Sequence, residues 1–282
     1  MAVLLGVDTG GTYTDAVLVE DDKTVLASAK SLTTRSDLAQ GIGASVAAVI
    51  DRAGVDPASI AMAALSTTLA TNALVEGHGG RVALVYIGFN RKDLATHGLT
   101  DALAGDPLIV LEGGHTHAGV EAAPLDGVAL SDWLAGLVGV SAFAVASQFG
   151  TRNPAHELKA AEIIRAATGA PVSCSHHLSA KLNGPKRALT ALLNARLIGM
   201  IDRLIGRAQD ALIASGVNAP LMVVRGDGAL ISAAMARERP IETILSGPAA
   251  SIVGARWLTG AEHALVSDIG GTTTDIAVLR DG

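Results

Sequence analysis

The sequence predicts an α/β protein in which helices cover a sheet. Short apolar runs of strand length alternate along the chain with longer segments of helical spacing, and this alternation is typical of α/β sheet proteins. Of the 282 residues, 49% are hydrophobic and only 2% are aromatic. We therefore expect a core of Ala, Val, Leu and Ile side chains, in a globular chain long enough for one large or two ordinary domains.

The front of the chain is expected to form a β-hairpin followed by a helix. Apolar runs at residues 2–7 and 16–19 flank a turn that contains two adjacent glycines, which is the pattern of strand, tight turn and strand. Residues 36–53 carry helical spacing, with Ser36 as the N-cap and Gly54 as the terminator.

The following segments continue the alternation of strand and helix. Residues 60–65 indicate a short strand, and residues 66–76 indicate a helix that opens with hydroxyl side chains and ends at Gly77. After its first residue, Arg81, the segment 81–87 is apolar and rich in β-branched residues, which favours a buried strand. The stretch 90–127 is richer in Gly, His and Pro, and we expect it to be mostly loop.

The middle of the chain repeats the same order of elements. We expect a helix at residues 130–137 and a buried strand at 142–146. The dipeptide 153–154 supplies an N-cap asparagine and a first-turn proline for a helix that ends at Gly169. A short strand is expected at residues 172–175.

The longest helical pattern covers residues 185–215 and ends at Gly216. After it we expect a strand at 221–224 and a helix at 249–258. A final pair of strands encloses a second glycine turn near the end of the sequence.

The two glycine turns carry the same motif. Asp8-Thr-Gly-Gly-Thr-Tyr-Thr-Asp15 is matched by Asp268-Ile-Gly-Gly-Thr-Thr-Thr-Asp275. Paired glycines allow positive φ and bring backbone N–H groups close to a ligand. Threonine hydroxyls add hydrogen bonds to anionic oxygens, and a leading aspartate can hold a cation beside them. The alternative is two hairpins whose Thr and Asp side chains only cap turns, but the identical spacing favours a nucleotide site.

The motif therefore predicts that two turns hold one nucleoside triphosphate and its magnesium from opposite sides. Asp8 and Asp268 are the candidate catalytic and Mg²⁺-organising residues, whereas Asp15 and Asp275 are expected to hold the turns through hydrogen bonds to the backbone. The candidate phosphate-binding residues are Thr9, Gly10, Gly11, Thr12, Thr14, Gly270, Gly271, Thr272, Thr273 and Thr274.

Charge and composition exclude several classes of function. The formal net charge is −6 and there is no dense run of Lys or Arg, which argues against a nucleic-acid or anionic-membrane surface. No apolar stretch approaches the length of a membrane span, and the start of the chain lacks the features of a signal peptide. The single cysteine, Cys174, fits a reducing compartment. We expect a soluble cytoplasmic protein.

Together these segments resemble the front part of the hydantoinase A/oxoprolinase family, which shares the ATPase fold of actin, Hsp70 and the sugar kinases. The resemblance rests on the glycine motif at 6–15, the segments 66–74 and 244–249, and the second glycine motif at 268–275. They run in the family's order across essentially the whole chain.

The resemblance implies ribonuclease H-like lobes of the actin/Hsp70 type. Residues 1–180 would form the N-terminal ATPase lobe, and residues 181–282 would form a connecting long helix and the start of a second, incomplete lobe. A composition shift near residues 181–185 marks the same boundary.

The resemblance also implies a reaction. Family members use ATP to phosphorylate a carbonyl oxygen, and they open five-membered cyclic amides of the 5-oxoproline or hydantoin type or activate a substrate for carboxylation. An amide is a poor electrophile until its oxygen becomes a phosphate leaving group, so catalysis would rest on positioning and charge neutralisation. The implied cofactors are ATP and Mg²⁺, and the implied partners are the cyclic amide, a hydantoinase B-like subunit and a second copy in a homo-oligomer.

Two other functions remain open on the same fold. One is a non-metabolic ATPase switch of the Hsp70 or actin type, in which closure of the lobes is itself the output. The other is a small-molecule kinase that transfers phosphate to a hydroxyl group.

Other polar segments have two interpretations. Ser66, Thr67, Thr68 and Asn72 lie at an expected helix start, where they can act as N-caps or bind an anion. Ser246-Gly-Pro248 precedes the expected helix 249–258 and is interpreted as a hinge or as packing against the nucleotide turn, because proline has no N–H to donate.

Two pairs of histidines have spacings that can ligate a metal. His115 and His117 lie two residues apart in a glycine-rich loop, and His176 and His177 lie beside Cys174. Zinc requires three or four converging ligands, and solvated loop histidines are the more common case. Cys174 lies in an apolar strand pattern and is expected to be a small core residue.

Overall fold

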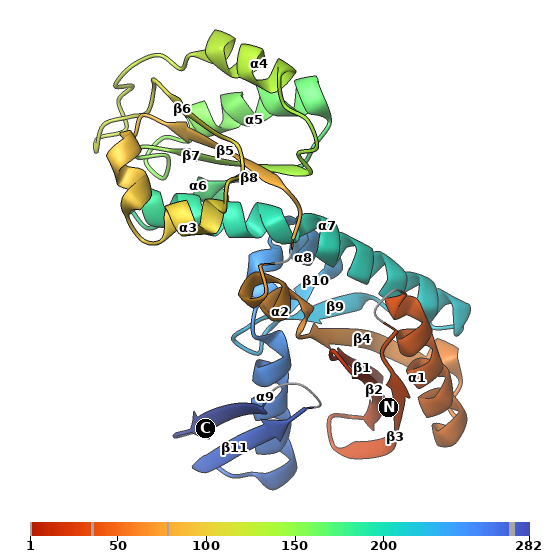
Figure 1. The fold of residues 1–282 in the computed structure, drawn as a ribbon. Helices are drawn as coiled ribbons and strands as arrows, with labels where there is room; N and C mark the ends of the chain where they lie inside the picture. The colour runs from red at the N-terminus through yellow and green to blue at the C-terminus, as the bar shows by residue number, and fades with distance from the viewer. Residues whose placement is uncertain (1, 35–36, 78, 271–273) are drawn as a thin grey trace. The chain divides into compact units, whose positions relative to one another are not determined.

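The computed structural model describes residues 2–34, 37–77, 79–270 and 274–282. The chain divides into two compact units (Figure 1). The first consists of Met1–Gly77 and Ile201–Gly282, and the second consists of His78–Met200. The second unit is therefore an insertion within the sequence of the first.

The first unit is built on a mixed sheet of six strands. The strands are β1 (Val3–Thr9), β2 (Tyr13–Glu20), β3 (Thr24–Leu32), β4 (Ile60–Thr67), β9 (Leu221–Val224) and β10 (Leu230–Ser232), in the order β10-β9-β4-β1-β2-β3. The strands β1, β2 and β3 are antiparallel neighbours, β4 runs parallel to β1, and β9 runs parallel to β4. This is the ribonuclease H-like arrangement that the resemblance implies.

Side chains alternate between the two faces of this sheet, as the period of a strand requires. In β1, Leu5 and Val7 are buried on the face that α1 (Leu38–Ala53) covers, whereas Gly6 and Asp8 belong to the opposite face. Asp37 caps the helix by accepting a hydrogen bond from the backbone of Ala39. The expected N-cap, Ser36, lies outside the described residues. The expected terminator, Gly54, has a φ of 63° and ends the helix.

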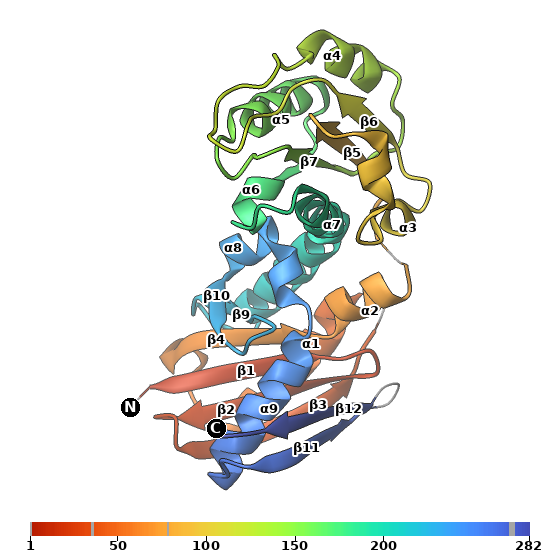
Figure 2. The same cartoon turned by 90° about the vertical axis from the view of Figure 1, so that its left-hand side faces the viewer.

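The remaining elements of the first unit lie around the sheet. They are η1 (Pro57–Ser59), α2 (Leu69–Val75), α8 (Ala233–Glu238), η3 (Pro240–Thr243), α9 (Ser246–Thr259), β11 (Ala264–Ile269) and β12 (Thr274–Leu279). Helix α9 packs on β4 and β9, and it is tied to the β2–β3 turn by a 2.9 Å hydrogen bond from Trp257 Nε1 to Asp22 O. The antiparallel pair β11–β12 packs on α9 (Figure 2).

The second unit contains a parallel sheet of four strands. They are β5 (Val82–Ile87), β6 (Leu108–Leu111), β7 (Ala142–Ser147) and β8 (Val172–Cys174), in the order β6-β5-β7-β8. Its helices are η2 (Arg91–Ala95), α3 (Leu99–Leu103), α4 (Gly127–Ala135), α5 (Ala155–Thr168), α6 (Ser175–Leu178) and the first part of α7 (Gly184–Ala214). Every residue of β5 and β7 is buried, as expected for a parallel sheet covered on both faces.

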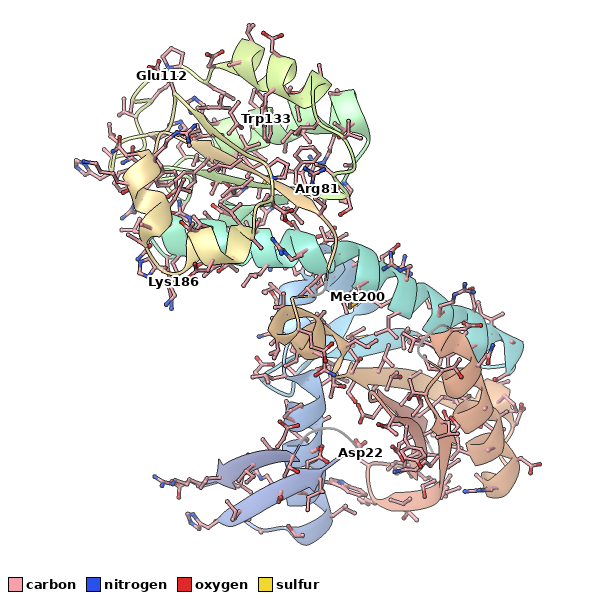
Figure 3. All side chains as sticks on the ribbon, viewed as in Figure 1. Asp22, Arg81, Glu112, Trp133, Lys186 and Met200 are labelled. Carbon is pink, nitrogen blue, oxygen red and sulfur yellow. The ribbon has the colours of Figure 1, made fainter. Side chains whose placement is uncertain are left out.

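The two faces of this sheet carry separate cores. Leu84 and Tyr86 pack with Leu192 of α7, whereas Val85 and Ile87 pack on the opposite face, in a core to which α4 and α5 contribute. Trp133 of α4 packs against this second core (Figure 3). Among the described residues, no helix has both the length and the hydropathy needed to cross a bilayer.

Most expected elements are present, but the expectation of a loop over residues 90–127 is wrong. This stretch contains α3 and the strand β6. Strand β6 has only four residues and pairs with β5, a tertiary partner that the local pattern does not reveal. The helix expected at 66–76 is also shorter than expected, because β4 continues to Thr67. The strands β3 and β10 and the helix α8 form where the sequence pattern predicts no element.

The compact units do not follow the expected boundary between residues 180 and 181. Their limits lie after Gly77 and after Met200. Helix α7 runs without a break across the second limit, from Gly184 to Ala214. A composition shift marks where this helix begins, whereas compactness depends on contacts between segments that are distant in sequence.

Candidate functional site

The first glycine turn joins β1 to β2 in the first unit. The Gly10 N–H donates to the carbonyl of Tyr13 at 3.0 Å, and the Thr33 N–H donates to the carbonyl of Thr12 at 2.9 Å. A Cβ on Gly10 would lie 3.1 Å from the carbonyl oxygen of Tyr13. Neither Gly10 nor Gly11 has positive φ. The expectation of positive φ is therefore wrong here, and the close approach of the backbone explains why Gly10 is a glycine.

The threonines of this motif point in different directions. Thr9 and Thr14 are fully buried on the face that α1 covers. The hydroxyls of Thr14 and Thr33 are 3.0 Å apart and hydrogen-bonded, whereas Oγ1 of Thr9 has no hydrogen-bond partner. Thr12 is half-buried at the tip of the turn. The hydroxyls of Thr9 and Thr14 thus belong to the core, and Thr12 stays the candidate phosphate contact.

Asp8 is the penultimate residue of β1, lies on the opposite face of the sheet and is half-buried. Its Oδ1 accepts a 2.6 Å hydrogen bond from the hydroxyl of Ser66. Burial raises the pKa of Asp8, the Ser66 hydrogen bond opposes this rise, and the negative charges of Asp15 and Asp268 add to it. A carboxylate with these surroundings gains from a bound cation, which would stabilise its ionised form.

Asp8 belongs to a row of polar side chains that crosses four adjacent strands. Ser66 of β4 is in register with Asp8 of β1, Asp8 with Asp15 of β2, and Asp15 with Lys30 of β3. The Lys30 ammonium lies 3.3 Å from Oδ1 of Asp15. The sequence predicts that Asp15 holds the turn, whereas the partner of its side chain among the described residues is this lysine of the neighbouring strand.

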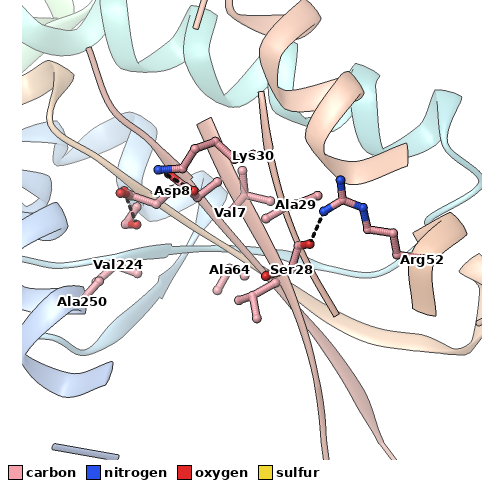
Figure 4. A pocket seen from close by; sticks show the side chains of 14 residues that line it. Val7, Asp8, Ser28, Ala29, Lys30, Arg52, Ala64, Val224 and Ala250 are labelled. Atoms are coloured by element: carbon pink, nitrogen blue, oxygen red, sulfur yellow. Dashed lines mark hydrogen bonds and ion pairs between the residues drawn. The ribbon is translucent and has the colours of Figure 1, made fainter. Parts of the chain in front are cut away.

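A pocket of about 500 Å³ opens on this face of the sheet (Figure 4). The polar row lines it, together with small residues that include Gly6, Ala64 and, from α9, Ala250. None of the residues 9–14, all of which are described, lines the pocket. Because Asp8 directly precedes this turn in β1, it lies between the glycine turn and the pocket.

Two further motif segments converge on the end of β1. The hydroxyl of Ser246 donates to the carbonyl of Thr67 at 2.9 Å and accepts from the Thr67 N–H at 3.3 Å. The hydroxyl of Thr67 donates to the carbonyl of Thr9 at 3.2 Å and accepts from the N–H of Leu69. These contacts favour packing and capping roles for Thr67 and Ser246, whereas Ser66 contacts the candidate site directly.

The second glycine motif begins in β11 and ends in β12. Asp268 of β11 is directly opposite Asp275 of β12, as Asp8 is opposite Asp15. The hydroxyl of Ser251, on α9, donates to Asp268 Oδ2. Gly270 and Thr274 are described and exposed, and the candidates Gly271, Thr272 and Thr273 lie outside the described residues. Asp268 is near enough for its charge to raise the pKa of Asp8.

The second unit contains a buried polar network that sequence reasoning missed. The carboxylate of Glu157 is fully buried at the start of α5. It accepts hydrogen bonds from the backbone N–H groups of Ser147 and His176, the hydroxyls of Ser147 and Ser175, and Nδ1 of His176. Burial alone would raise the pKa of Glu157, but the hydrogen bonds, led by that of His176, hold it below its ordinary value. An acidic residue in the first turn of a helix is common, so the sequence did not reveal this role.

Arg187 completes this network from α7. Its side chain is 1% exposed and donates to the carbonyls of Ser147, Lys181 and Leu182 and to the hydroxyl of Ser175. The positive charge of Arg187 offsets the negative charge of Glu157. The sequence does contain a signal for this role. Arg187 lies four residues before the buried Ala191, and residues with this spacing share one face of a helix.

The histidine candidates have mainly structural surroundings. The ring of His115 is buried against that of His156 at a centroid distance of 4.4 Å, whereas His117 is exposed. Within the described residues, one set of three donors converges, namely Glu157, Cys174 and His176. Its carboxylate is already occupied by hydrogen bonds, and burial raises the pKa of the Cys174 thiol to about 12. This donor set does not favour a metal, and Cys174 is the core residue that the sequence predicts.

Comparison with known proteins matches two long segments of the chain to models of one protein family. Residues 4–168 match the model of the hydantoinase/oxoprolinase N-terminal region, and residues 187–282 match the hydantoinase/oxoprolinase model. Caprolactamase subunit alpha of Pseudomonas jessenii is 29% identical over 99% of this chain and 43% of its own length.

Two solved structures have the same fold. The crystal structure of ATP-dependent caprolactamase from Pseudomonas jessenii has a TM-score of 0.78 at 28% identity, over 98% of this chain and 43% of that chain. The nucleotide-free structure of acetone carboxylase, from work on ATP-dependent acetone carboxylation, has a TM-score of 0.82 at 21% identity, over 99% of this chain and 44% of that chain. The chain spans less than half the length of these relatives. It belongs to the hydantoinase/oxoprolinase family.

Proposed function

We propose that the protein takes part in the ATP-dependent hydrolysis of a cyclic amide of the 5-oxoproline or hydantoin type, as one chain or one subunit of the enzyme. The proposal is supported by family membership and by the relative named as an ATP-dependent caprolactamase, because a caprolactamase acts on a cyclic amide. A hydantoinase B-like subunit is a proposed partner, since that relative is named as a subunit.

The chemistry of the proposed site rests on two aspartates. Asp8 and Asp268 each lead one glycine turn, and the charge of Asp268 acts on Asp8. They would organise Mg²⁺ directly or through water, and the backbone of the turns with Thr12 would hold the phosphates. Bound ATP would supply the phosphoryl group that turns the amide oxygen into a leaving group.

The observation that carries the proposal is the position of Asp8. It lies at the junction of the glycine turn and the pocket of about 500 Å³, in a row with Ser66 and Asp15. A phosphate donor at the turn and an acceptor in the pocket would therefore meet beside the same carboxylate. Such an arrangement lowers a barrier by positioning the two reactants.

The test is the substitution Asp8→Asn in the complete protein. We expect loss of Mg²⁺-dependent phosphate release stimulated by 5-oxoproline or hydantoin, because a neutral amide no longer attracts the cation. Asp51→Asn, an exposed position on α1, is the matched control and should keep full turnover. Full turnover in the Asp8 variant would contradict the proposed role.

The same assay separates the alternative functions. A stable phosphorylated product would indicate a small-molecule kinase, and stimulation by unfolded protein clients would indicate a switch of the Hsp70 type. Ring opening coupled to phosphate release supports the amide hydrolase.

A further inference from the structure

Lys30 and Asp15 place a hydrogen-bond donor and an acceptor side by side on the wall of the pocket. The two residues are in register on β3 and β2, and their charged atoms are 3.3 Å apart. Their side chains are 58% and 47% exposed, so a ligand in the pocket can reach both. The side chain of Lys30 extends toward Asp8 (Figure 4), and its charge lowers the pKa of Asp8. The pair therefore adjoins the proposed place of phosphoryl transfer.

The part of the pocket floor next to this pair is apolar. One step along the same face, Ala64, Gly6 and Val17 are in register across β4, β1 and β2, and all three line the pocket. A Cβ on Gly6 would lie 3.1 Å from Cγ1 of Val17, so the floor has no room for a larger residue without displacing its neighbour. The absence of a side chain at Gly6 and the small one at Ala64 open the space that the pocket occupies.

This combination matches the shape and chemistry of a small cyclic amide. A small ring forces its amide into the cis form, which places the C=O acceptor and the N–H donor on one edge. The ammonium of a lysine can donate to the C=O while a carboxylate accepts from the N–H. The other atoms of the ring are apolar, and they fit against an apolar floor.

We propose that Lys30 and Asp15 form a specificity-determining pair that binds the cis-amide edge of the substrate. Lys30 donates to the carbonyl oxygen, Asp15 accepts from the ring N–H, and the ring lies on Gly6 and Ala64. This inference rests on the proposed function and adds the residues that select the substrate. A competing role for Lys30 is neutralisation of a nucleotide phosphate, which would affect the KM for ATP instead.

The test compares two rings that differ only at nitrogen, 2-pyrrolidone and N-methyl-2-pyrrolidone. In the complete protein we expect kcat/KM for stimulated ATP turnover to be about tenfold higher with the N–H ring, the effect of one net hydrogen bond. Lys30→Met and Asp15→Ala should each lower kcat/KM for 2-pyrrolidone about tenfold and leave the KM for ATP unchanged. Asp15→Ala should also abolish the preference between the two rings. Lys23→Met, in the exposed β2–β3 turn, is the matched control and should behave as the unmodified protein.

Three outcomes would overturn the inference. The first is an equal response of the unmodified protein to both rings. The second is a ring preference that survives in Asp15→Ala, because a steric effect of the methyl group would persist there. The third is a raised KM for ATP in Lys30→Met with no change in the response to 2-pyrrolidone, because this places Lys30 on the nucleotide.

Direct binding separates failure of this inference from failure of the proposed function. If no cyclic amide stimulates ATP turnover, the proposed hydrolase function fails. Calorimetric titration of the complete protein with the same two rings then tests the pair alone. Binding of 2-pyrrolidone that is weakened about tenfold in Lys30→Met and in Asp15→Ala supports the pair. No binding of 2-pyrrolidone, or equal binding of both rings, overturns it.

Discussion

Ser66 is expected to set the pH at which Asp8 becomes ionised. Its hydroxyl donates a 2.6 Å hydrogen bond to the carboxylate, and this bond opposes the rise in pKa that burial causes. A hydrogen bond to a charged group contributes about 1.5–3 kcal/mol, and one pKa unit corresponds to about 1.4 kcal/mol. Because Asp8 is half-buried, we take the lower end of this range. Ser66→Ala should then raise the pKa of Asp8 by about one unit.

The assay is the pH profile of kcat/KM for Mg²⁺-dependent ATP turnover. Mg²⁺ binding requires ionised Asp8, so activity should fall as the pH drops through the pKa of this residue, which already lies above the ordinary value of 3.8. In Ser66→Ala the acid limb of the profile should move to higher pH by about one unit, while the value of kcat/KM on the high-pH plateau stays the same. Ser59→Ala, on exposed η1, is the control. An acid limb that stays in place, or moves to lower pH, would refute the reasoning.

Three further predictions concern groups away from the pocket. Glu157→Gln should lower the free energy of unfolding of the second unit by about 3 kcal/mol, because Arg187 would lose its buried counter-charge. Hydrogen exchange of the backbone amides in β7 and β8 measures this free energy. Folding lowers the pKa of Glu157 below its unfolded value of 4.5. The stability that this residue contributes is therefore complete above pH 4.5 and is lost as the pH falls through the folded pKa. The Gln variant should lack this acid dependence. Thr14→Val should cost about 1 kcal/mol of stability through loss of the Thr33 hydrogen bond and leave the KM for ATP unchanged, whereas a raised KM would return Thr14 to the phosphate site. Metal analysis should find no zinc at Cys174, and zinc that is bound in the unmodified protein and lost in Cys174→Ala would contradict the structural interpretation.

The fold class and the position of the first glycine turn could be predicted from the sequence. Short apolar runs and helical stripes with Gly terminators are local signals, and they locate β1, β2, α1 and α7 well. Strand β6 could not be found this way, because four apolar residues become a strand only through pairing with β5. The boundaries of the compact units depend on contacts between Met1–Gly77 and Ile201–Gly282, which no local pattern contains.

The residue types of the candidate site could be predicted from the sequence. Which face of the sheet each side chain lies on could be predicted less well. The motif identifies Asp8 and the glycines, but alternation along β2 turns the hydroxyl of Thr14 into the core and leaves Asp15 on the pocket face. No local sequence pattern marks Lys30 as a site residue. It lies in the unpredicted strand β3 and reaches the site only through its register with Asp15. Glu157 and Arg187 are 30 residues apart in sequence, and only the fold shows that their charges offset each other.

The alignment of the polar row also fixes how far apart its members can be. Ser66, Asp8, Asp15 and Lys30 stand at one level on four neighbouring strands, so the spacing of their backbones is that of the sheet, about 4.8 Å per strand. Loops at the strand ends can lengthen without altering these distances. A single residue inserted before Asp8 within β1 would instead rotate its carboxylate to the side of α1 and bring an apolar side chain into its place. The sheet thus fixes the distances between the groups that contact a ligand. These distances withstand changes in the loops but not the insertion of a residue within a strand.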